Sequence, residues 1–456
     1  MSKIIAIVGR PNVGKSTLFN RITGSKTAIV HHTSGVTRDR NYSEADWQGR
    51  KFFLIDTGGF IPDTDSGFNK EIRDQILFAI RESDEVIFTV DANEGIHPVD
   101  FEFARLLRKY LNDKRVILVA NKSDNNEREL STVEFHKLGL GEPVPVSAIS
   151  GRNVADLLDI LTENISPDEL TPDDNRIKFA IIGKPNAGKS SIVNAIVGEN
   201  RSIVSDIPGT TRDSIDSVIK YYGNEIVLID TAGLRKKSKL KRSESLEFYS
   251  TIRTYKSISR CDVAILVIDA TELMKEFENY PDLRNAPFKL DRQDARIIED
   301  VERLRKGLLI VINKWDLVEK DTHTEKIMKQ KIVAHLKSIY YLKFIFISAL
   351  TGQRIHKVIQ TAKEIYDERN RKIKTGELNE KMQQEIKIKP PQSVNGKEIK
   401  INYITQIKTS PPLIVFFCND PKSIKENYKR FLEKKFREHF GFEGVPVSFI
   451  FKKKND

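Results

Sequence analysis

The feature that most constrains this chain is an eight-residue stretch, Gly9–Ser16, that directly follows the apolar run Ile4–Val8. It fits the pattern G-x-x-x-x-G-K-[ST], which in this strand-then-helix context forms a phosphate-binding loop. Its glycines let backbone N–H groups close around phosphate oxygens, and the following helix adds the positive end of its dipole. The same pattern returns at Gly183–Ser190, again after an apolar run. A second complete copy makes a chance match untenable, so the sequence predicts two phosphate-binding loops.

Each predicted loop carries a lysine and a hydroxyl that suit a nucleoside triphosphate. Lys15 can reach the β- and γ-phosphates, and the hydroxyl of Ser16 can ligate Mg²⁺. Lys189 and Ser190 repeat this pair. We expect phosphate contacts from Gly9, Arg10, Pro11, Asn12, Val13, Gly14, Lys15, Ser16 and Thr17, and from Gly183, Lys184, Pro185, Asn186, Ala187, Gly188, Lys189, Ser190 and Ser191.

Further motifs follow both loops in the same order. A threonine in a polar segment and an aspartate ending an apolar run come at identical steps after each loop, namely Thr37 with Asp56 and Thr211 with Asp230. Apolar strands alternate with segments of helical period near 69–82, 98–111 and 153–165. This alternation predicts an α/β fold with doubly wound, mostly parallel sheets, whose ligand loops lie at the carboxyl ends of the strands.

A base-recognition motif, Asn-Lys-x-Asp, follows a later strand in both copies. Asp124 and Asp316 can each accept hydrogen bonds from N1–H and the exocyclic amine of guanine, a donor pair that adenine lacks. A site built on such bonds discriminates by ~10⁴-fold or more. The motif therefore favours GTP over ATP. The expected base pockets are Asn121, Lys122, Asp124, Ser147 and Ala148, and Asn313, Lys314, Asp316, Ser348 and Ala349.

The Asp-x-x-Gly motifs predict a switch that depends on the γ-phosphate. Asp56 and Asp230 can hold Mg²⁺ through water, and Gly58 and Gly233 can present backbone N–H to the γ-phosphate. Thr37 and Thr211 can ligate Mg²⁺ only when their loops fold in, which gives ordered and released states. Thr57, Gly59, Thr231 and Ala232 complete these motifs.

The glutamine that many GTPases place after this motif is missing. Phe60 and Leu234 are found near that position, and neither side chain can polarise water. We therefore expect slow intrinsic turnover, with charge stabilisation from another group. Another side chain that orients the water is the open alternative.

Four segments are expected along the chain. They are a GTPase domain at 1–165, an acidic linker at 166–176, a second GTPase domain at 177–372 and a small α+β domain at 373–456. Helix, strand, strand, helix and strand are expected in the last segment, with the apolar strand Leu413–Cys418 among them. In its final helix the aromatic residues read mostly as core and the basic residues as RNA contacts. The segment Gly441–Gly444 fits G-x-x-G but precedes a strand, so we do not interpret it as an RNA clamp.

Two segments of the second copy leave alternatives open. The longer step from Asp230 to Asn313 indicates an insertion near Leu273–Leu290, which reads as a polar surface loop. The basic run Arg235–Arg242 is either a solvated loop or a phosphate-backbone contact made in one nucleotide state.

Charge and composition narrow the partners and the compartment. The net charge is +11, and lysine and arginine outnumber acidic residues within 373–456. That excess fits either a polyanionic partner or a solvated lysine-rich surface. Cys261 and Cys418 have no metal-ligand spacing, and neither a secretory signal nor an apolar run of membrane-spanning length is seen, so we expect a cytoplasmic protein.

With these motifs in hand, the whole chain resembles the bacterial tandem GTPases of the Der (EngA) family, within the TrmE–Era–EngA group. The resemblance is carried by two GxPNxGKS loops, two G-x-T-R-D segments, DTGG then DTAG, and NKSD then NKWD. It implies a KH-like third domain, binding to the large ribosomal subunit and its rRNA, and a role in assembly by a protein that is monomeric off the ribosome. Ser34 departs from the proline that Pro208 keeps in the second copy.

The resemblance also implies how hydrolysis proceeds without glutamine. A potassium ion near the phosphates would aid the reaction, and Asn12 and Asn186 match the loop position that coordinates it. With them, Lys15, Thr37, Gly58, Lys189, Thr211 and Gly233 form the expected catalytic set. The alternative function is that of a GTPase partner of an RNA-modification enzyme. A membrane-associated signalling GTPase is disfavoured, because no lipidation motif is present.

Overall fold

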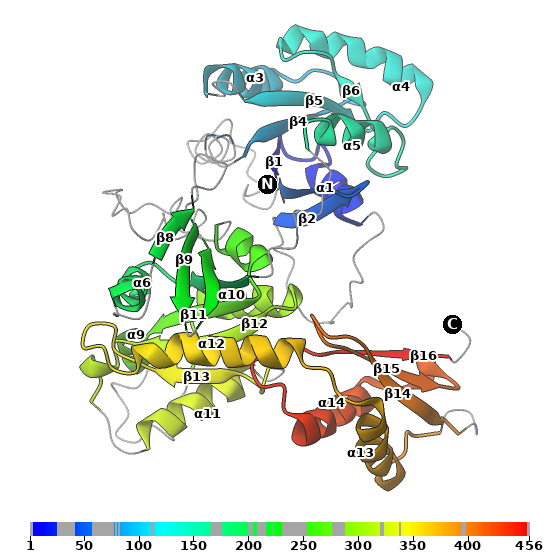
Figure 1. Cartoon of the computed structure of the whole chain (residues 1–456). Helices are drawn as coiled ribbons and strands as arrows, with labels where there is room; N and C mark the ends of the chain where they lie inside the picture. Colours follow the sequence, from blue (N-terminus) through cyan, green and yellow to red (C-terminus); the bar gives the residue numbers. More distant parts are fainter. Residues whose placement is uncertain are drawn as a thin grey trace. The chain divides into compact units, whose positions relative to one another are not determined.

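The computed structural model describes residues 3–24, 42–56, 77, 80, 83–110, 114–165, 176–198, 204–207, 216–221, 223–229, 253–275, 288–319, 323–336, 339–393 and 398–453. These residues form two compact units, which divide between residues 165 and 176. Each unit is described by itself below (Figure 1). No helix among the described residues is long and apolar enough to cross a membrane.

The first unit is built on a six-stranded sheet with the order β2-β3-β1-β4-β5-β6. Its strands are β1 (Lys3–Val8), β2 (Tyr42–Trp47), β3 (Arg50–Asp56), β4 (Glu85–Asp91), β5 (Arg115–Asn121) and β6 (Val144–Pro145). All neighbours pair in parallel except β2, which runs antiparallel to β3. Every residue of β4 is buried, as expected of a central strand covered on both faces. The doubly wound α/β architecture is confirmed.

Helices cover this sheet on both faces. They are α1 (Lys15–Gly24), α3 (Pro98–Tyr110), α4 (Asn126–Ser131), the 3₁₀ helix η2 (Thr132–Leu138) and α5 (Val154–Thr162). Leu18 and Ile22 of α1 and Leu157 and Leu161 of α5 share one apolar core with the sheet. Because α1 starts at Lys15, the phosphate loop lies at the carboxyl end of β1.

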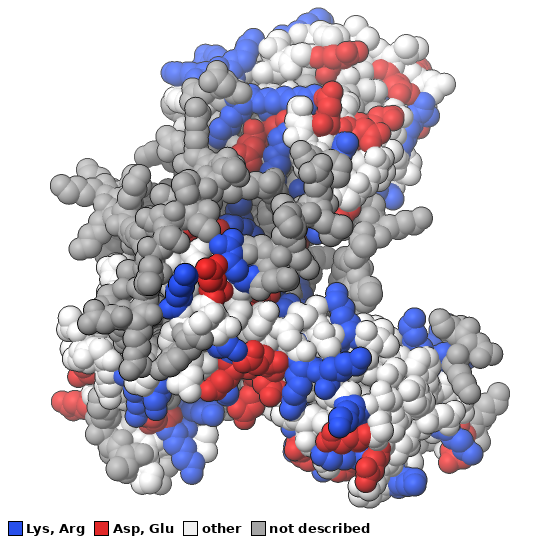
Figure 2. Space-filling model, in the orientation of Figure 1, with Lys and Arg blue, Asp and Glu red and all other residues white. Residues whose placement is uncertain are grey.

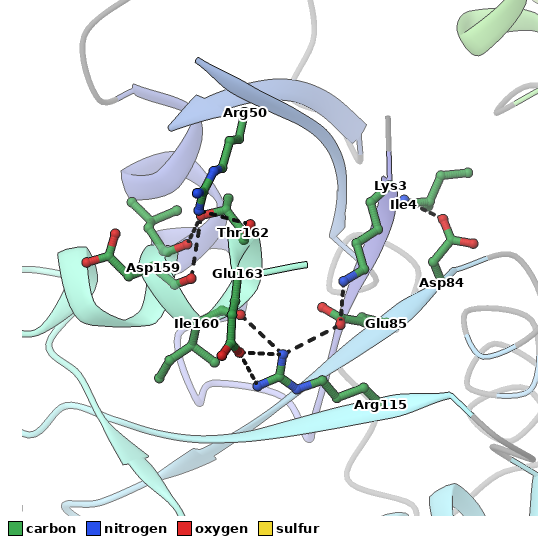
Figure 3. Close-up of polar contacts among 11 residues, drawn as sticks. Lys3, Ile4, Arg50, Asp84, Glu85, Arg115, Asp159, Ile160, Thr162 and Glu163 are labelled. Atoms are coloured by element: carbon green, nitrogen blue, oxygen red, sulfur yellow. Dashed lines mark hydrogen bonds and ion pairs between the residues drawn. The ribbon is translucent and has the colours of Figure 1, made fainter. Parts of the chain in front are cut away.

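Polar contacts join the strands at the end of this sheet that lies opposite the phosphate loop, where the parallel strands begin (Figure 3). Lys3 pairs with Glu85 at 2.5 Å, and the Asp84 carboxylate accepts from the backbone N–H of Ile4 at 2.7 Å. Arg115 bonds the end of α5, where the Ile160 carbonyl accepts at 3.3 Å. These contacts hold β1, β4, β5 and α5 together. The ligand-binding loops lie at the other end of the strands.

The second unit contains a seven-stranded sheet with the order β13-β12-β11-β7-β10-β9-β8. The strands are β7 (Ile177–Ile182), β8 (Val204–Ile207), β9 (Asp216–Tyr221), β10 (Asn224–Ile229), β11 (Val263–Asp269), β12 (Gly307–Asn313) and β13 (Lys343–Phe346). Its helices are α6 (Lys189–Gly198), α9 (Ala270–Lys275), α10 (Arg292–Arg303), α11 (Thr324–Leu336) and α12 (Ile355–Asn370), with the 3₁₀ helix η3 (Trp315–Leu317). The central part of the first sheet is thus repeated, because β7, the strand before the second phosphate loop, also has a parallel strand on each side.

The same unit continues into a C-terminal subdomain. It comprises α13 (Thr375–Ile388), β14 (Ile401–Lys408), β15 (Leu413–Cys418), the 3₁₀ helix η4 (Pro421–Ser423), α14 (Glu426–Phe440) and β16 (Ser448–Lys452). β15 pairs antiparallel with β14 and parallel with β16. The expected order of helix, strand, strand, helix and strand is confirmed, and Tyr428, Leu432 and Phe436 are core as predicted.

The C-terminal subdomain shares a core and hydrogen bonds with the second GTPase sheet. The Leu308 N–H of β12 donates to the Gly444 carbonyl at 2.8 Å, and the Gly444 N–H donates to the Tyr341 carbonyl at 2.7 Å. The buried guanidinium of Arg437 lies 3.7 Å from the centre of the Tyr341 ring. The G-x-x-G segment is thus used to join two parts of the chain, which agrees with not interpreting it as an RNA clamp.

Two expectations were wrong in detail. The insertion was expected to be a polar surface loop; its ends differ, because Leu273 lies within helix α9 and Leu273 and Leu290 are both buried in an apolar cluster with Ile297, while residues 276–287 lie outside the described residues. Arg437 was grouped with the exposed basic residues of the last helix, but it is buried and pairs with Glu433 at 3.1 Å. Charge on the face in view in Figure 2 is mixed over the described residues of both units, with basic and acidic side chains side by side.

Candidate nucleotide-binding sites

The backbone of the first phosphate loop requires glycine at both ends. Gly9 and Gly14 have φ of +151° and +89°, in the region that glycine occupies readily. A Cβ on Gly9 would collide with the carbonyl of Thr89, and one on Gly14 with the side-chain amide of Asn121. The loop therefore packs directly on β4 and on the predicted base motif, which fixes its position.

Lys15 lies across this loop. Its Nζ donates to the Arg10 carbonyl at 2.7 Å, and only 4% of the residue is exposed. Burial lowers the pKa of Lys15 to about 8, although the Asp56 carboxylate opposes this shift. A buried ammonium held mainly by a carbonyl is poised to gain from an anion, because a phosphate would restore the favourable charge interaction lost on burial.

Ser16 and Asp56 meet beside the loop. The Ser16 hydroxyl donates to Asp56 Oδ2 at 2.6 Å, which brings the end of β3 against the first turn of α1. A hydroxyl and a carboxylate oxygen are the hard oxygen ligands that Mg²⁺ prefers. The donor set therefore fits the metal expected with a nucleoside triphosphate.

The predicted base residues of the first unit form one connected network. Asn121 donates to the Val13 carbonyl at 2.8 Å and accepts from the Ala148 N–H at 3.0 Å, so it joins the phosphate loop to the base loop. Asp124 accepts from the Ser147 hydroxyl at 2.6 Å and pairs with Arg128 at 3.0 Å. The motif therefore assembles as expected, with Asp124 presented beside Ser147.

The second unit repeats these contacts with its own residues. Lys189 donates to the carbonyl of Lys184, the counterpart of Arg10, at 2.5 Å and to the Gly183 carbonyl at 2.8 Å, and burial lowers its pKa to about 8. Asn313 donates to the Ala187 carbonyl at 2.9 Å and accepts from the Ala349 N–H at 3.0 Å. The bonds of the loop lysine and of the bridging asparagine are thus repeated at equivalent positions.

Asp316 differs from its counterpart Asp124. Its Oδ1 is buried and has no hydrogen-bond donor among the described residues. An unpaired buried carboxylate oxygen is costly, and a ligand N–H would remove that cost. The N1–H and amine of guanine are donors of that kind, so the chemistry of this pocket fits the base predicted for it.

A basic side chain follows the first glycine of each phosphate loop, and nearby carboxylates form ion pairs with it. Arg10 pairs with Glu94 at 2.8 Å and with buried Asp100 at 3.4 Å. Lys184 lies among Asp291 at 3.0 Å, Glu272 at 3.2 Å and Asp294 at 3.7 Å. Through these pairs each phosphate loop is tied to the helix that follows the central strand.

The three carboxylates around Lys184 are not equivalent. Burial raises the pKa of Asp294 to about 7, while Lys184 opposes that shift and the neighbouring acids add to it. The pKa of Asp291 is instead lowered, because its bonds to Lys184 and to backbone N–H groups outweigh its burial. Glu272 and Asp291 stand immediately outside the two ends of the insertion, so both ends are anchored at the second phosphate loop.

The structure brings most predicted residues together and leaves some outside its described part. Pro11, Asn12, Val13 and Thr17, and Pro185, Asn186, Ala187, Ser190 and Ser191, lie in the loops and the first turns of α1 and α6. Outside the described residues lie Thr37, Thr57, Gly58, Gly59, Thr211, Asp230, Thr231, Ala232 and Gly233, together with Ser34, Phe60, Pro208, Leu234 and 235–242.

Two lysine partners were missed in the sequence. Asp91 and Asp269 each end a central strand and pair at 2.5 Å with Lys122 and Lys314. These pairs hold the lysine stems beside the base loop. The signal was present, because an aspartate at the carboxyl end of a buried strand is placed at the ligand edge of such a sheet.

Two family models and full-length relatives match this chain, and a solved structure is similar to part of it. The model of a 50S ribosome-binding GTPase family matches residues 4–122 and 178–314, and a model of the KH-domain-like C-terminal part of EngA bacterial GTPase enzymes matches 372–452. GTPase Der of Chloroherpeton thalassium is 48% identical over 454 residues, and GTPase Der of Chlorobium phaeobacteroides is 49% identical over 455, each alignment covering 100% of both chains. A solved structure of Era from Aquifex aeolicus, bound to GDP.AlF4-, matches with TM-score 0.29 and 23% identity, over 56% of this chain and 88% of that chain.

The fold and the paired pockets define a P-loop GTPase with two nucleotide-binding domains in one chain. At this identity and coverage, the chain belongs to the GTPase Der family. It therefore binds guanine nucleotides and hydrolyses GTP, and its C-terminal subdomain is KH-like.

Proposed function

We propose that this GTPase binds the large ribosomal subunit in its GTP form, assists assembly of that subunit and leaves after hydrolysis. The observation that carries this proposal is the continuous core that joins the second nucleotide-binding domain to the KH-like subdomain. A nucleotide site and an RNA-binding fold on one framework are what a nucleotide-gated RNA binder requires. The match to a family described as 50S ribosome-binding supports the choice of partner.

In this proposal each pocket divides its work among three groups of residues. The loops 9–17 and 183–191 hold the phosphates, and Asp124 and Asp316 select guanine. Asn121 and Asn313 keep the two loops of each pocket in register, as their bonds to Val13 and Ala187 support.

Each pocket would hold Mg²⁺ with Ser16, Thr37 and Asp56 or with Ser190, Thr211 and Asp230. When bound, the ion would neutralise charge on the β- and γ-phosphates. The bond between Ser16 and Asp56 supports the first set. Lys15 and Lys189 would supply the remaining positive charge at the phosphates, and Gly58 and Gly233 would donate backbone N–H to the γ-phosphate.

Hydrolysis would proceed slowly and would be stimulated by K⁺, held with the help of Asn12 and Asn186. Both asparagines have positive φ, 66° and 64°, which asparagine tolerates better than most residues. The backbone alone can therefore account for these asparagines. Comparing hydrolysis in KCl and NaCl, for the native protein and for Asn12→Gly with Asn186→Gly, separates a side-chain role from a backbone requirement.

The protein would act in the cytoplasm and would be a monomer when off the ribosome. Its domains would span 1–165, 177–372 and 373–456, with a linker at 166–176.

A test of the proposed function is co-sedimentation with separated small and large subunits in a GTP analogue, in GDP and without nucleotide. Binding to large subunits only with the analogue is expected. Absence of binding in every state at low salt, where phosphate contacts are strongest, would refute it.

A further inference from the structure

The three-stranded sheet of the KH-like subdomain has two different faces. Phe416 of β15 contacts Phe449 and Phe451 of β16, and Phe449 meets Phe436 of α14 edge to face. These rings lie on the side that α13 and α14 cover, and Figure 1 shows both helices on that side of the sheet. The other side is called the open face here.

Strand register defines the open face. Tyr403 of β14 lies opposite Phe417 of β15, which lies opposite Lys452 of β16. A second row joins Lys408, Leu413 and Ser448, with half-buried Thr405 and Ile450 and fully buried Val415 between the two rows. The rings of Tyr403 and Phe417 have centroids 6.0 Å apart, and Tyr403 is 47% exposed. Tyr403 and half-buried Phe417 therefore form an aromatic platform that solvent reaches at Tyr403.

Charge on this platform has one sign. The sequences of β14, β15 and β16 contain two lysines, Lys408 and Lys452, and no acidic residue. Both lysines are exposed. An anionic partner with flat rings would match the lysines and the aromatic rings at once.

Part of the basic charge on the helical side of the subdomain is paired with carboxylates. Lys435 pairs with Glu438 at 2.9 Å and with Glu385 at 3.6 Å, and Lys429 pairs with Glu426 at 3.2 Å. The G-x-x-G segment, which clamps backbone phosphates in KH domains, is bonded through Gly444 to the second GTPase domain. Both features favour the sheet over the helices as the anion-binding side of the subdomain.

We propose that the open face binds single-stranded RNA, with bases stacking on Tyr403 and Phe417 and phosphates meeting Lys408 and Lys452. Unpaired bases present π-faces that stack on aromatic side chains with little dependence on sequence, while lysines follow the backbone. Duplex RNA keeps its bases stacked internally and lacks these faces. The inference rests on the proposed ribosomal function, since it identifies which RNA surface the KH-like subdomain reads.

The test is fluorescence anisotropy of the full-length protein with a short fluorescein-labelled oligouridylate, competed by unlabelled single-stranded and duplex RNA. Tyr403→Leu should weaken binding by about tenfold, the loss of one stacked base, while Tyr403→Phe keeps the ring and the affinity. Phe101→Leu is the matched control, because Phe101 is 43% exposed on α3 of the other unit. Unchanged binding by Tyr403→Leu would overturn the proposal.

Removing two lysine charges at once tests which side of the subdomain meets the phosphates. Lys408→Gln with Lys452→Gln should reduce affinity and lower the slope of log affinity against log salt by about one to two. Arg430→Gln with Lys434→Gln removes the same charge from exposed positions of α14 and should have a smaller effect. The reverse order, competition by duplex as strong as by single strands, or no binding by the native protein would each refute the open face as the RNA site.

Co-sedimentation with large subunits keeps the two proposals apart. If the native protein binds subunits and Tyr403→Leu binds both subunits and oligonucleotide normally, the open-face inference fails and the ribosomal function stands. If the native protein does not bind subunits, the ribosomal function fails, whatever the oligonucleotide shows.

Discussion

Asn121 bridges Val13 and Ala148, and through that one side chain the phosphate loop and the base loop of the first pocket are held together. The amide donates to the Val13 carbonyl at 2.8 Å and accepts from the Ala148 N–H at 3.0 Å. Asn313 makes the equivalent pair of bonds in the second pocket. Since Asn121 is buried, neither of its partners can exchange the bond for water at low cost.

We expect Asn121→Ala to weaken guanine nucleotide binding in the first pocket by about tenfold or more and to destabilise its domain by ~1–3 kcal/mol, because a buried carbonyl and N–H lose their partners. The affinity is best measured with GTP in an Asp316→Asn background, in which the second pocket no longer prefers guanine. Asn126→Ala, a change of the same kind at an exposed position of α4, serves as the control. Equal affinities for the two alanine variants would contradict the bridging role.

Asp124→Asn and Asp316→Asn should each shift one pocket toward xanthine nucleotides, because an amide donor can pair with the additional base oxygen. The relative affinities for GTP and XTP, measured by competition, check this. The loss of GTP affinity should be larger for Asp316, whose buried Oδ1 has no donor among the residues that the structure describes, than for Asp124, which has Ser147 and Arg128 as partners. Retained guanine preference in both variants would show that the base pocket is assigned wrongly.

Nucleotide binding should take up protons near pH 8. In the protein without nucleotide, burial lowers the pKa values of Lys15 and Lys189 to about 8, so each amine is about half protonated at that pH. Phosphate favours the charged form, so affinity should fall as pH rises above about 8. Calorimetry in buffers of different ionisation enthalpy should show about half a proton taken up per pocket at pH 8, and Lys15→Arg should remove the share of the first pocket. Binding without proton uptake would rule out this coupling.

Asp294 should make the second nucleotide-binding domain less stable as pH rises from about 4 to about 7. Its pKa is raised to about 7 in the folded chain from an ordinary value of 3.8, so the stability linked to its protonated form is present below pH 4 and lost as pH passes 7. The effect amounts to ~4 kcal/mol at most. Asp294→Asn should abolish this slope in urea unfolding followed by Trp315 fluorescence, with Trp47→Phe removing the other tryptophan. A slope that persists in the Asn variant would assign it to other groups.

The sequence predicted the parts of this fold that local pattern determines. The apolar run Leu413–Cys418 became β15 with the same bounds, and the predicted helix at Pro98–Leu111 became α3, which ends one residue earlier. The strand β2 was missed, because Tyr42–Trp47 is mostly polar and becomes a strand by pairing antiparallel with β3. Its partner follows after only the two-residue turn Gln48–Gly49, where both residues have positive φ, so the strand arises from hairpin pairing and not from an apolar pattern of its own.

The candidate site shows the same division. The residues of the two pockets could be named, since their motifs fix both chemistry and spacing. The carboxylates around Lys184 could not, because Glu272, Asp291 and Asp294 approach it only once α9 and α10 pack on the sheet. Burial of Leu273 and Leu290 was also unpredictable, since both flank a polar segment and reach the core from its two ends.

Strand β12 connects the KH-like subdomain directly to the second nucleotide pocket. Its second residue is bonded to the KH-like subdomain, where the Leu308 N–H donates to the Gly444 carbonyl, and its last residue, Asn313, donates to the Ala187 carbonyl in the second nucleotide pocket. Only roughly 20 Å separates these ends in an extended strand, and β11 and β13 fix it on either side. A change of nucleotide in the second pocket can therefore reach the KH-like subdomain through β12 and the strands bonded to it.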